Sequence, residues 1–528
     1  MPGRWALGVV LAVAAAVRVA ALACDARLPL FSHYRLDSLF YDRLARALAA
    51  GDLGLGGQPF HLSPLYTCLL GVVYFGFGSG PWPIRIVQLL IGLGTVALIY
   101  QLARMLFGES WALACGLAAA LYGPLIFYDG QLLSDGLATF LHALVLLGVV
   151  RVLAQPTRRT WLLLGLFWGL CAVTRASALV LPVWLAIFWA PFRPRWQSAL
   201  LLAGGVAAVI LPVALRNRLA AGELIPITDS GGLNFYIGNG PGANGTFRVP
   251  PELPGAVNAD EQFKLFRAAA EKASGRPLLA RQVDAFWTRR ALASIAAAPA
   301  HWLRIEAEKV WLFWNAREIP NSEDYSFMRR LNPVLALPLV QAAWILPLAL
   351  VGTLALLASR RPAERYLGLT NLVICLSIAA FFMLARYRLV AVPSLLLAAV
   401  ACLERLRAAW AARAWRRLAL GGAALVPACA LALAPKLPKP LDDEYFKLGY
   451  AYHVQAQPEA AERAYRQALS LNPDHISAHK NLGVLYQGRG DRTRARVEWS
   501  TVARLAQATG QAAYGEDARR HLAALEAP

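Results

Sequence analysis

Apolar runs long enough to cross a bilayer recur along the chain up to Pro435, and they limit what it can fold into. A membrane-spanning helix needs about 20 mostly apolar residues, and runs such as Ile84–Leu106 and Leu335–Leu357 meet that length. The composition agrees, because 58% of the residues are hydrophobic and only 16% are charged, whereas soluble domains carry about 25% charged residues. The sequence therefore predicts an all-α, polytopic membrane helix bundle.

We expect about eleven spans, several of them short. They are Trp5–Ala23, Ile84–Leu106, Trp111–Phe127, Gly136–Leu153, Trp161–Val173, Ala178–Ala190, Ala199–Leu215, Leu335–Leu357, Leu367–Leu384, Leu389–Leu403 and Leu418–Ala434. Leu62–Phe77 is apolar but short and rich in glycine and aromatic residues, so we interpret it as a helix dipped into the membrane interface.

The basic residues indicate which side of the membrane each link faces. The net charge is +20, and the arginines cluster in short links between apolar runs, as the positive-inside rule describes. With the N-terminus in the cytoplasm, the basic links lie inside; they are residues 104–109, 151–160, 191–197, 359–366 and 404–417. The loop after the first span, the acidic link Tyr128–Asp135 and the C-terminus then lie outside.

Several function classes are excluded by what the sequence lacks. It has no basic groove motif with interleaved aromatic residues, so no nucleic-acid partner is expected. It has no P-loop and no histidine-rich metal motif, which argues against an ATPase. The seven cysteines are isolated and lie mostly inside apolar runs, which favours buried, unpaired thiols.

The C-terminal part repeats itself with a period of 34 residues. The matching pairs are Leu448 and Leu482, Gly449 and Gly483, Tyr452 and Tyr486, Ala461 and Ala495, Tyr465 and Trp499, and Ala468 and Val502. This is the pattern of tetratricopeptide repeats, and Ala512–Leu525 is expected to cap the stack. Such a stack binds peptides or partner proteins, so we assign recruitment to it and place catalysis elsewhere.

These boundaries divide the chain. The expected parts are a membrane bundle at 1–215 with a first outer loop at 25–83, an outer loop domain at 216–333, further spans at 334–434, a proline-rich linker at 435–441 and tetratricopeptide repeats at 442–528.

Charged residues from separate outer links are the candidates for chemistry. Asp37 and Asp135 are candidate catalytic acids, since a carboxylate can take the proton of an attacking hydroxyl. Arginines suit the binding of a phosphate. The candidate substrate-binding residues are Arg175, Arg386, Arg388, Asp42 and Asn239.

Each candidate also has a purely structural interpretation. Asp37 and Asp135 each stand at the start of a helix and could serve only as caps. Asp42 is spaced four residues from Arg46, which favours a surface ion pair. The pair Arg386 and Arg388 could anchor the membrane interface.

Three further polar features are expected to be structural. Asp129 is interpreted as a solvated loop acid, and His61 as a structural residue. The stretch Asn234–Gly245 is dense in turn residues, so we expect turns there.

Six segments together resemble the GT-C class of membrane glycosyltransferases. They read DSLFYDRLARAL, HLSPLY, FYDGQLLSDGL, GLCAVTRASAL, NFYIGNGPGANG and ARYRLVAVPSLL. The resemblance is to the bacterial branch that includes protein O-mannosyltransferases and aminoarabinose transferases. It implies a polyprenyl-phosphate sugar donor and a catalytic base in the first outer loop, at Asp37, with Asp135 matching a second recurrent acid. Asp37 is followed by Ser38 where the protein mannosyltransferases have a second acid, which leaves the acceptor open.

The sequence thus predicts an inverting glycosyltransferase of the bacterial inner membrane that acts on its periplasmic face. The donor would be a polyprenyl-phosphate sugar, the acceptor hydroxyl would belong to a lipid, glycan or protein, and the tail would bind a protein partner. The sequence requires no cofactor, although it leaves room for a divalent cation. The alternatives are a flippase of lipid-linked sugar, which should show inverted repeats, and a membrane-anchored scaffold.

Overall fold

The computed structural model describes residues 2–180, 196–250, 259–321, 324–435 and 440–526. Within these ranges the chain is helical, and its extended pairs are two isolated bridges, Tyr122 with Val340 and Thr246 with Met383. The prediction of an all-α chain is confirmed for this part of the sequence. The chain separates into two compact units, residues 1–22 with 34–435 and residues 23–33 with 436–528.

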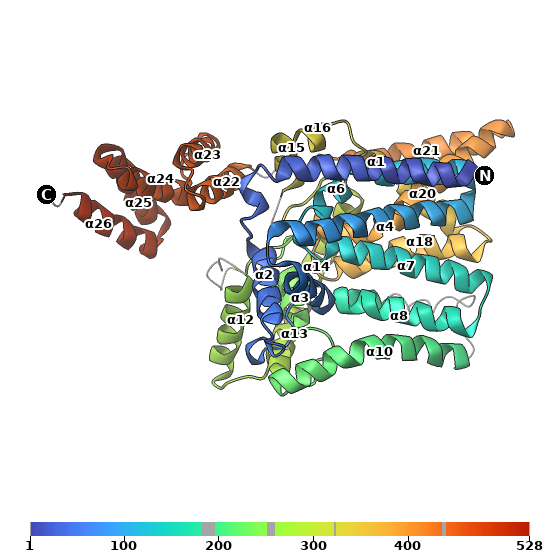
Figure 1. Cartoon of the computed structure of the whole chain (residues 1–528), viewed down its shortest axis with the longest axis horizontal. Helices are drawn as coiled ribbons and strands as arrows, with labels where there is room; N and C mark the ends of the chain where they lie inside the picture. The colour runs from blue at the N-terminus through green and yellow to red at the C-terminus, as the bar shows by residue number, and fades with distance from the viewer. Residues whose placement is uncertain (1, 181–195, 251–258, 322–323, 436–439, 527–528) are drawn as a thin grey trace. The chain divides into compact units, whose positions relative to one another are not determined.

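Among the described residues, six helical segments are long and apolar enough to cross a membrane, and they agree with a multi-pass membrane protein. They are α1 (Pro2–Asp25), α4 (Pro81–Phe107), α7 (Asp135–Ala154), α10 (Trp196–Ala221), the stretch Ala385–Ala411 that ends in α20 (Val392–Ala411), and α21 (Trp415–Leu433). Figure 1 shows α1, α4, α7, α8 and α10 running alongside one another. Two shorter apolar helices join them, α3 (Pro64–Phe77) and α17 (Ala342–Leu357).

Other predicted spans appear in altered form. Trp111–Phe127 is broken into α5 (Glu109–Ala120) and α6 (Gly123–Asp129), because Pro124 has no backbone N–H to donate to Ala120 and its ring would clash with that carbonyl group. Two further predicted spans are α8 (Arg158–Thr174) and α18 (Pro362–Ala379), both below the length of the six. Most of the predicted span Ala178–Ala190 lies outside the described residues.

Small residues allow α8 and α10 to approach each other closely. A Cβ added at Gly165 would collide with the carbonyl oxygen of Leu202, and one at Gly205 would lie 2.7 Å from the carbonyl oxygen of Leu162. Lipid tails provide no hydrophobic drive for two helices to associate, so close backbone packing at small residues supplies the attraction.

Short helices form a layer at one end of the long helices, and Figure 1 shows α2, α12 and α13 there. The members of this layer and its connections are α2 (Leu36–Ala49), η2 (Leu55–Gly57), η3 (Ala176–Leu179), α11 (Gly231–Asn239), α12 (Ala259–Ser274), α13 (Ala280–Ala297), α14 (Pro299–Trp314), α15 (Tyr325–Leu331), α16 (Pro333–Ala336), α19 (Ala385–Arg388) and η5 (Leu389–Ala391). The short helix η1 (Pro29–Phe31) belongs to the second unit.

The turns expected at Asn234–Gly245 are found only in its second half. Residues Gly231–Asn239 form the helix α11. The expectation was wrong because the glycines here serve close packing: a Cβ at Gly232 would collide with the carbonyl oxygen of Asp284, and one at Gly238 with that of Phe381.

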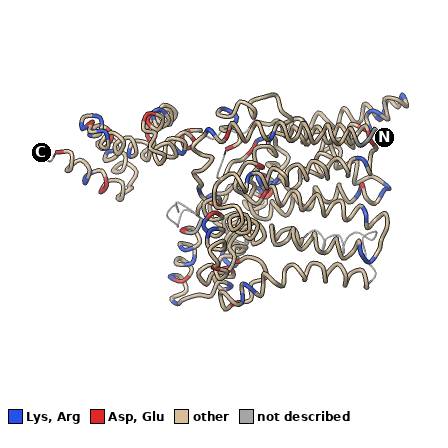
Figure 2. Tube along the Cα trace, viewed as in Figure 1, with Lys and Arg blue, Asp and Glu red and all other residues tan. Residues whose placement is uncertain are grey.

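Charge is distributed unevenly along the long helices. Figure 2 shows basic residues at those ends of the long helices that lie on the same side as the N-terminus. Few charged residues lie along the middle of these helices. Helix α7 illustrates the asymmetry, because Asp135 is its first residue and Arg151 lies in its last turn.

The second unit contains the repeats, and its helices are α22 (Asp442–Val454), α23 (Pro458–Leu471), α24 (Ile476–Gly488), α25 (Arg492–Thr509) and α26 (Ala512–Glu526). Tyr465, Leu482, Tyr486 and Trp499, which occupy matching repeat positions, share one buried core, to which α26 contributes Ala518 and Leu525.

Residues 23–33 also belong to this second unit. The side-chain amide of Gln455 on α22 donates to the carbonyl oxygen of Pro29 at 3.1 Å and to the hydroxyl of Ser32 at 3.2 Å. The ring of His33 meets that of Tyr450, with 5.5 Å between the centroids. The unit is therefore discontinuous in sequence.

Candidate functional site

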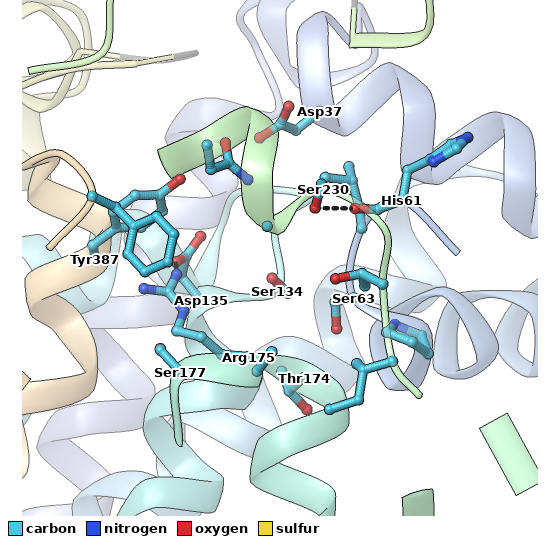
Figure 3. Close-up of a pocket in the computed structure, with 18 of the residues that line it drawn as sticks. Asp37, His61, Ser63, Ser134, Asp135, Thr174, Arg175, Ser177, Ser230 and Tyr387 are labelled. Atoms are coloured by element: carbon cyan, nitrogen blue, oxygen red, sulfur yellow. Dashed lines mark hydrogen bonds and ion pairs between the residues drawn. The ribbon is translucent and has the colours of Figure 1, made fainter. Parts of the chain in front are cut away.

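A cavity of about 220 Å³ lies where the beginnings of α2, α3 and α7 meet the end of α8 and the segment that leads into α19. We call it the central cavity. Its charged lining residues are Asp37, Asp135, Arg175 and Arg386, and hydroxyl groups from Ser63, Ser134, Thr174, Ser177 and Ser230 surround them. Figure 3 shows Asp135 and Arg175 together beside Tyr387, with Asp37 on another wall. Four of the sequence-predicted site residues thus line one cavity.

Asp37 lies in the first turn of α2 and forms an ion pair. Arg386 Nη2 donates to Asp37 Oδ2 at 2.6 Å, and both side chains are mostly buried. The cap position of α2 belongs to Arg35, and no side-chain cap bond forms there. The interpretation of Asp37 as a helix cap is therefore wrong, and its carboxylate is directed into the central cavity.

Asp135 is the first residue of α7 and is only 2% exposed. Arg175, at the end of α8, donates from Nη2 to Asp135 Oδ1 at 2.5 Å. Tyr387 lies between two guanidinium groups, with its ring centroid 4.5 Å from Arg175 Cζ and 5.2 Å from Arg386 Cζ. These cation–π contacts hold the guanidinium groups of Arg175 and Arg386 near the same aromatic ring.

Arg386 has unused hydrogen-bonding capacity. Its Nε is buried and has no hydrogen-bond partner among the described residues. A buried donor without a partner is costly, and a phosphate group, which accepts several hydrogen bonds from guanidinium groups, would satisfy it. The site has the chemistry of an anion-binding cavity with carboxylates on its rim.

Sequence reasoning missed Tyr41. Its hydroxyl donates to Ser134 Oγ at 3.3 Å and accepts from the backbone N–H of Ser63 at the same distance. Burial raises the pKa of the Tyr41 phenol far above its usual range, so the group remains protonated. The only signal in the sequence was its position one helical turn after Asp37 on α2.

Asp42 and Asn239 do not line the central cavity. Asp42 accepts from Arg46 Nε and from the hydroxyl of Tyr74, both at 2.8 Å, which agrees with the ion-pair interpretation. Asn239 donates to the carbonyl oxygen of Ala380 at 2.9 Å, and its own carbonyl accepts from Lys309 Nζ at 3.1 Å. Asn239 therefore fixes the segment that precedes Arg386.

Arg388 also lies away from the central cavity. It is 2% exposed and donates to the backbone oxygens of Phe313 and Asn315 at 3.1 and 2.5 Å. Its Nη2 pairs with Glu318 Oε1 at 2.8 Å. These contacts give it a structural role in joining the segment after α14 to α19.

Asp129 is not the solvated acid expected from the sequence. It is 7% exposed and accepts from Arg18 Nε at 2.8 Å, deep between α1 and α6. The expectation was wrong because Arg18 interrupts an apolar run, and a buried guanidinium requires a buried carboxylate.

His61 separates the central cavity from a larger one. Its Nδ1 lies 2.5 Å from Asp229 Oδ1, and its ring stacks on Phe263 with 4.6 Å between centroids. It lines both the central cavity and a second cavity of about 560 Å³ between α2, α12 and α13. We call this second space the side cavity. His61 thus has the structural partners that were expected, at a position between two cavities.

One cluster among the described residues has donor atoms close enough to share a metal ion, formed by Asp442, Asp443 and His475 in the tail. Its members already have partners, because Asp442 accepts from Asn472 Nδ2 and His475 Nε2 faces Asp443. At the central cavity both acids face arginines.

Residues 61–215 match the family model described as dolichyl-phosphate-mannose-protein mannosyltransferase, and residues 443–475 match that of the tetratricopeptide repeat. The resemblance inferred from the sequence is confirmed for these segments. The first segment matches a family of glycosyltransferases named for a polyprenyl-phosphate sugar. It contains His61, Asp135 and Arg175, whereas Asp37 and Arg386 lie outside it. No curated protein matches the chain.

Solved structures that match the chain include the oligosaccharyltransferase of Archaeoglobus fulgidus with zinc and sulfate, at 13% identity and a TM-score of 0.42 over 84% of this chain and 55% of that one. The present chain thus spans little more than half of that enzyme. ArnT from Cupriavidus metallidurans bound to undecaprenyl phosphate matches at 17% identity and a TM-score of 0.38, over 78% of this chain and 79% of that one.

Proposed function

We propose, from the match of residues 61–215 to a family of polyprenyl-phosphate-sugar glycosyltransferases, that the whole chain is an inverting enzyme of this kind. It would move one sugar from the lipid phosphate to an acceptor hydroxyl. The observation that carries the proposal is Arg386, a buried guanidinium that pairs with Asp37 and keeps a free donor in the central cavity.

In the proposed reaction the donor phosphate competes with Asp37 for Arg386. Once the phosphate occupies the guanidinium, the Asp37 carboxylate is released to act as a general base. It takes the proton of the acceptor hydroxyl while the hydroxyl oxygen forms a bond to the anomeric carbon. The bond from that carbon to the phosphate oxygen breaks, and its electron pair leaves with the lipid phosphate. Attack and departure on opposite faces invert the configuration.

The second pair of charges would steady the leaving group. Arg175 is fixed by Asp135 and lies against the ring of Tyr387, so its charge is already in place before the reaction begins. Fixed charges of this kind stabilise a transition state without reorganisation. Asp135 would then be a positioning residue whose buried charge keeps Arg175 directed at the phosphate.

An apolar recess continues from the central cavity and suits the lipid of the donor. It has a volume of about 40 Å³ and shares Arg175, Ser177, Ser377 and Tyr387 with the central cavity. Ile378 also lines both spaces, and the other walls of the recess include Trp168 and Ile374. A phosphate at the arginines would leave its prenyl chain next to these apolar side chains.

The acceptor would approach from the other side, through the side cavity. This space has charged and aromatic walls, including Arg43, Phe263 and Trp287. The shared residue His61 would then lie on the route of the acceptor to Asp37. The acceptor class remains lipid, glycan or protein.

We also propose the finer topology of about eleven spans, with the central cavity on the periplasmic face of a bacterial inner membrane. Helix α7 supports this orientation, because Asp135 lies at one end and Arg151 at the other. Basic residues favour the cytoplasmic side, which places Asp135 and the cavity outside. The tetratricopeptide tail would lie outside with the cavity and bind a protein partner.

This topology predicts the behaviour of reporters fused to the chain. An enzyme that is active only outside the cytoplasm should be active when fused after Pro528, and also within the 216–333 segment. A reporter active only inside should work in the 151–160 link. The reverse pattern would place the cavity on the cytoplasmic face.

The proposed reaction is tested through Arg386. We expect Arg386→Gln to weaken the apparent affinity for a polyprenyl-phosphate sugar by about 10- to 100-fold, because a hydrogen bond to a charged group contributes about 1.5–3 kcal/mol. Arg386→Lys should restore only part of the donor affinity, because the lysine ammonium is a point charge that cannot form a bidentate hydrogen bond to the phosphate. The measurement is release of lipid phosphate as a function of donor concentration.

Arg46→Gln is the matched control, since Arg46 also pairs with an aspartate of α2 but lies away from the cavity. It should leave the donor affinity unchanged. Equal donor affinity in wild type and Arg386→Gln would mean that Arg386 does not bind the donor phosphate, and it would contradict the proposed reaction.

A further inference from the structure

A third cavity, separate from the central cavity, is lined by four arginines. We call it the arginine cleft. It has a volume of about 650 Å³ and lies between the end of α10 and the beginning of α13. Its basic residues are Arg218 on α10, Arg276 in the connection from α12 to α13, and Arg281 and Arg289 on α13. None of the residues that line the cleft also lines the central cavity.

The positive charge of the arginine cleft is not neutralised by the protein. Glu223 is the one acid among its lining residues. That carboxylate already accepts from the backbone N–H groups of Ala280 and Arg281, at 2.8 and 3.2 Å. Among the described residues, none of the four arginines forms an ion pair with an acid. Four guanidinium groups around one space, without a carboxylate available to them, form a site for an anion.

The surroundings of the cleft indicate that this anion belongs to a lipid. Arg218 lies in the last turn of α10, whose apolar stretch is only 11% buried within the protein and is long enough to cross a membrane. Leu219, Leu224 and Leu279 near the cleft are 77%, 60% and 56% exposed. Exposed leucines beside arginines at the end of a membrane helix are typical of the level at which lipid headgroups lie.

We propose that the arginine cleft binds the phosphate of an anionic membrane lipid. The guanidinium groups hold the headgroup, and the acyl chains lie along the lipid-facing side of α10. The cleft shares Glu223 and Leu279 with the side cavity, which in turn reaches the central cavity at His61. A lipid anchored here is therefore held at the outer end of a row of cavities that leads to Asp37.

The test compares lipid binding by variants of the whole protein in detergent. Native mass spectrometry measures the bound lipid. The probes are phosphatidylglycerol, which is anionic, and phosphatidylcholine, which carries a phosphate but no net charge. We expect the triple variant Arg276→Gln, Arg281→Gln, Arg289→Gln to bind phosphatidylglycerol at least about tenfold more weakly than wild type, with phosphatidylcholine unchanged. Inorganic phosphate at equal concentration should not displace the lipid, because it lacks the acyl chains.

A matched control removes the same charge elsewhere. Arg492, Arg496 and Arg519 are exposed arginines of the tail, and their triple change to glutamine should leave lipid binding at the wild-type level. If both triple variants bind phosphatidylglycerol equally, the cleft is not the site. If inorganic phosphate displaces phosphatidylglycerol, the natural ligand of the cleft is a free anion, and the proposal of a lipid is wrong.

Two further measurements keep the test independent of folding and of catalysis. In unaltered protein, the preference for phosphatidylglycerol over phosphatidylcholine should decline as salt is raised, since exposed charges are screened, and a salt-independent preference would contradict the proposal. Arg386→Gln should retain full lipid binding at the cleft. Loss of transfer without loss of lipid binding would concern the proposed reaction alone.

Discussion

An Asp37→Asn variant should transfer sugar about 100- to 10,000-fold more slowly than wild type, the usual contribution of a general base. The substitution keeps the size of the side chain and removes the group that accepts the proton of the acceptor. It also removes the negative partner of Arg386, whose Nη2 lies 2.6 Å from the carboxylate. Donor binding should therefore persist or strengthen, because the phosphate no longer competes with Asp37.

Asp42→Asn provides the matched control on the same helix. Asp42 is also buried and also paired with an arginine, Arg46 at 2.8 Å, but it does not line the central cavity. Its change should alter the rate by no more than a few-fold. The measurement is initial rate with saturating donor, after checking that both variants reach wild-type levels in the membrane. A slow Asp42 variant and a normal Asp37 variant would show that the wrong acid was chosen.

The second large effect is on stability. Arg388→Gln should lower the free energy of unfolding by about 3–5 kcal/mol, as expected when one partner of a buried ion pair is removed. The change leaves Glu318 without its cation, and the carbonyl oxygens of Phe313 and Asn315 without their shared donor. We expect a lower melting temperature in detergent and less protein in the membrane.

The pH dependence distinguishes this mechanism from general damage. Burial raises the pKa of Glu318, and the guanidinium of Arg388 opposes that rise. Without Arg388 the folded-state pKa rises further above the unfolded value, so the folded protein binds more protons than the unfolded one. Stability of the variant should then increase as the pH falls through that raised pKa toward the unfolded value.

A second substitution should rescue the variant. Adding Glu318→Gln to Arg388→Gln removes the unpaired charge, so the double variant should be more stable than the single one at neutral pH. A double variant no more stable than the single one would mean that the lost backbone hydrogen bonds, rather than Glu318, dominate.

Sequence patterns were sufficient for the helical architecture and the tail. Apolar run length predicts long helices such as α4, and the period of 34 residues predicts the core around Trp499. They were insufficient where a helix breaks inside an apolar run, as at Tyr122. They also failed at Gly231–Asn239, because glycines that permit close backbone contact look the same in sequence as glycines that make turns.

The candidate site was predictable as a set of charges but not in its pairing. Asp37, Asp135, Arg175 and Arg386 do line one cavity, yet which acid faces which arginine depends on contacts between distant segments. Arg386 and Arg388 differ in role because residues two apart on a helical turn point in different directions, and the short helix that carries them was not apparent in the sequence.

The discontinuous second unit has a consequence for how the protein is made. Residues 23–33 pack with helices that begin at Asp442, so their partner emerges from the ribosome roughly 400 residues later. At about 5–20 residues per second, this segment waits on the order of 20 to 80 s while the membrane helices are inserted. The segment that ends at His33, four residues before the proposed base Asp37, therefore lacks its packing partner from the tail while the membrane helices are inserted.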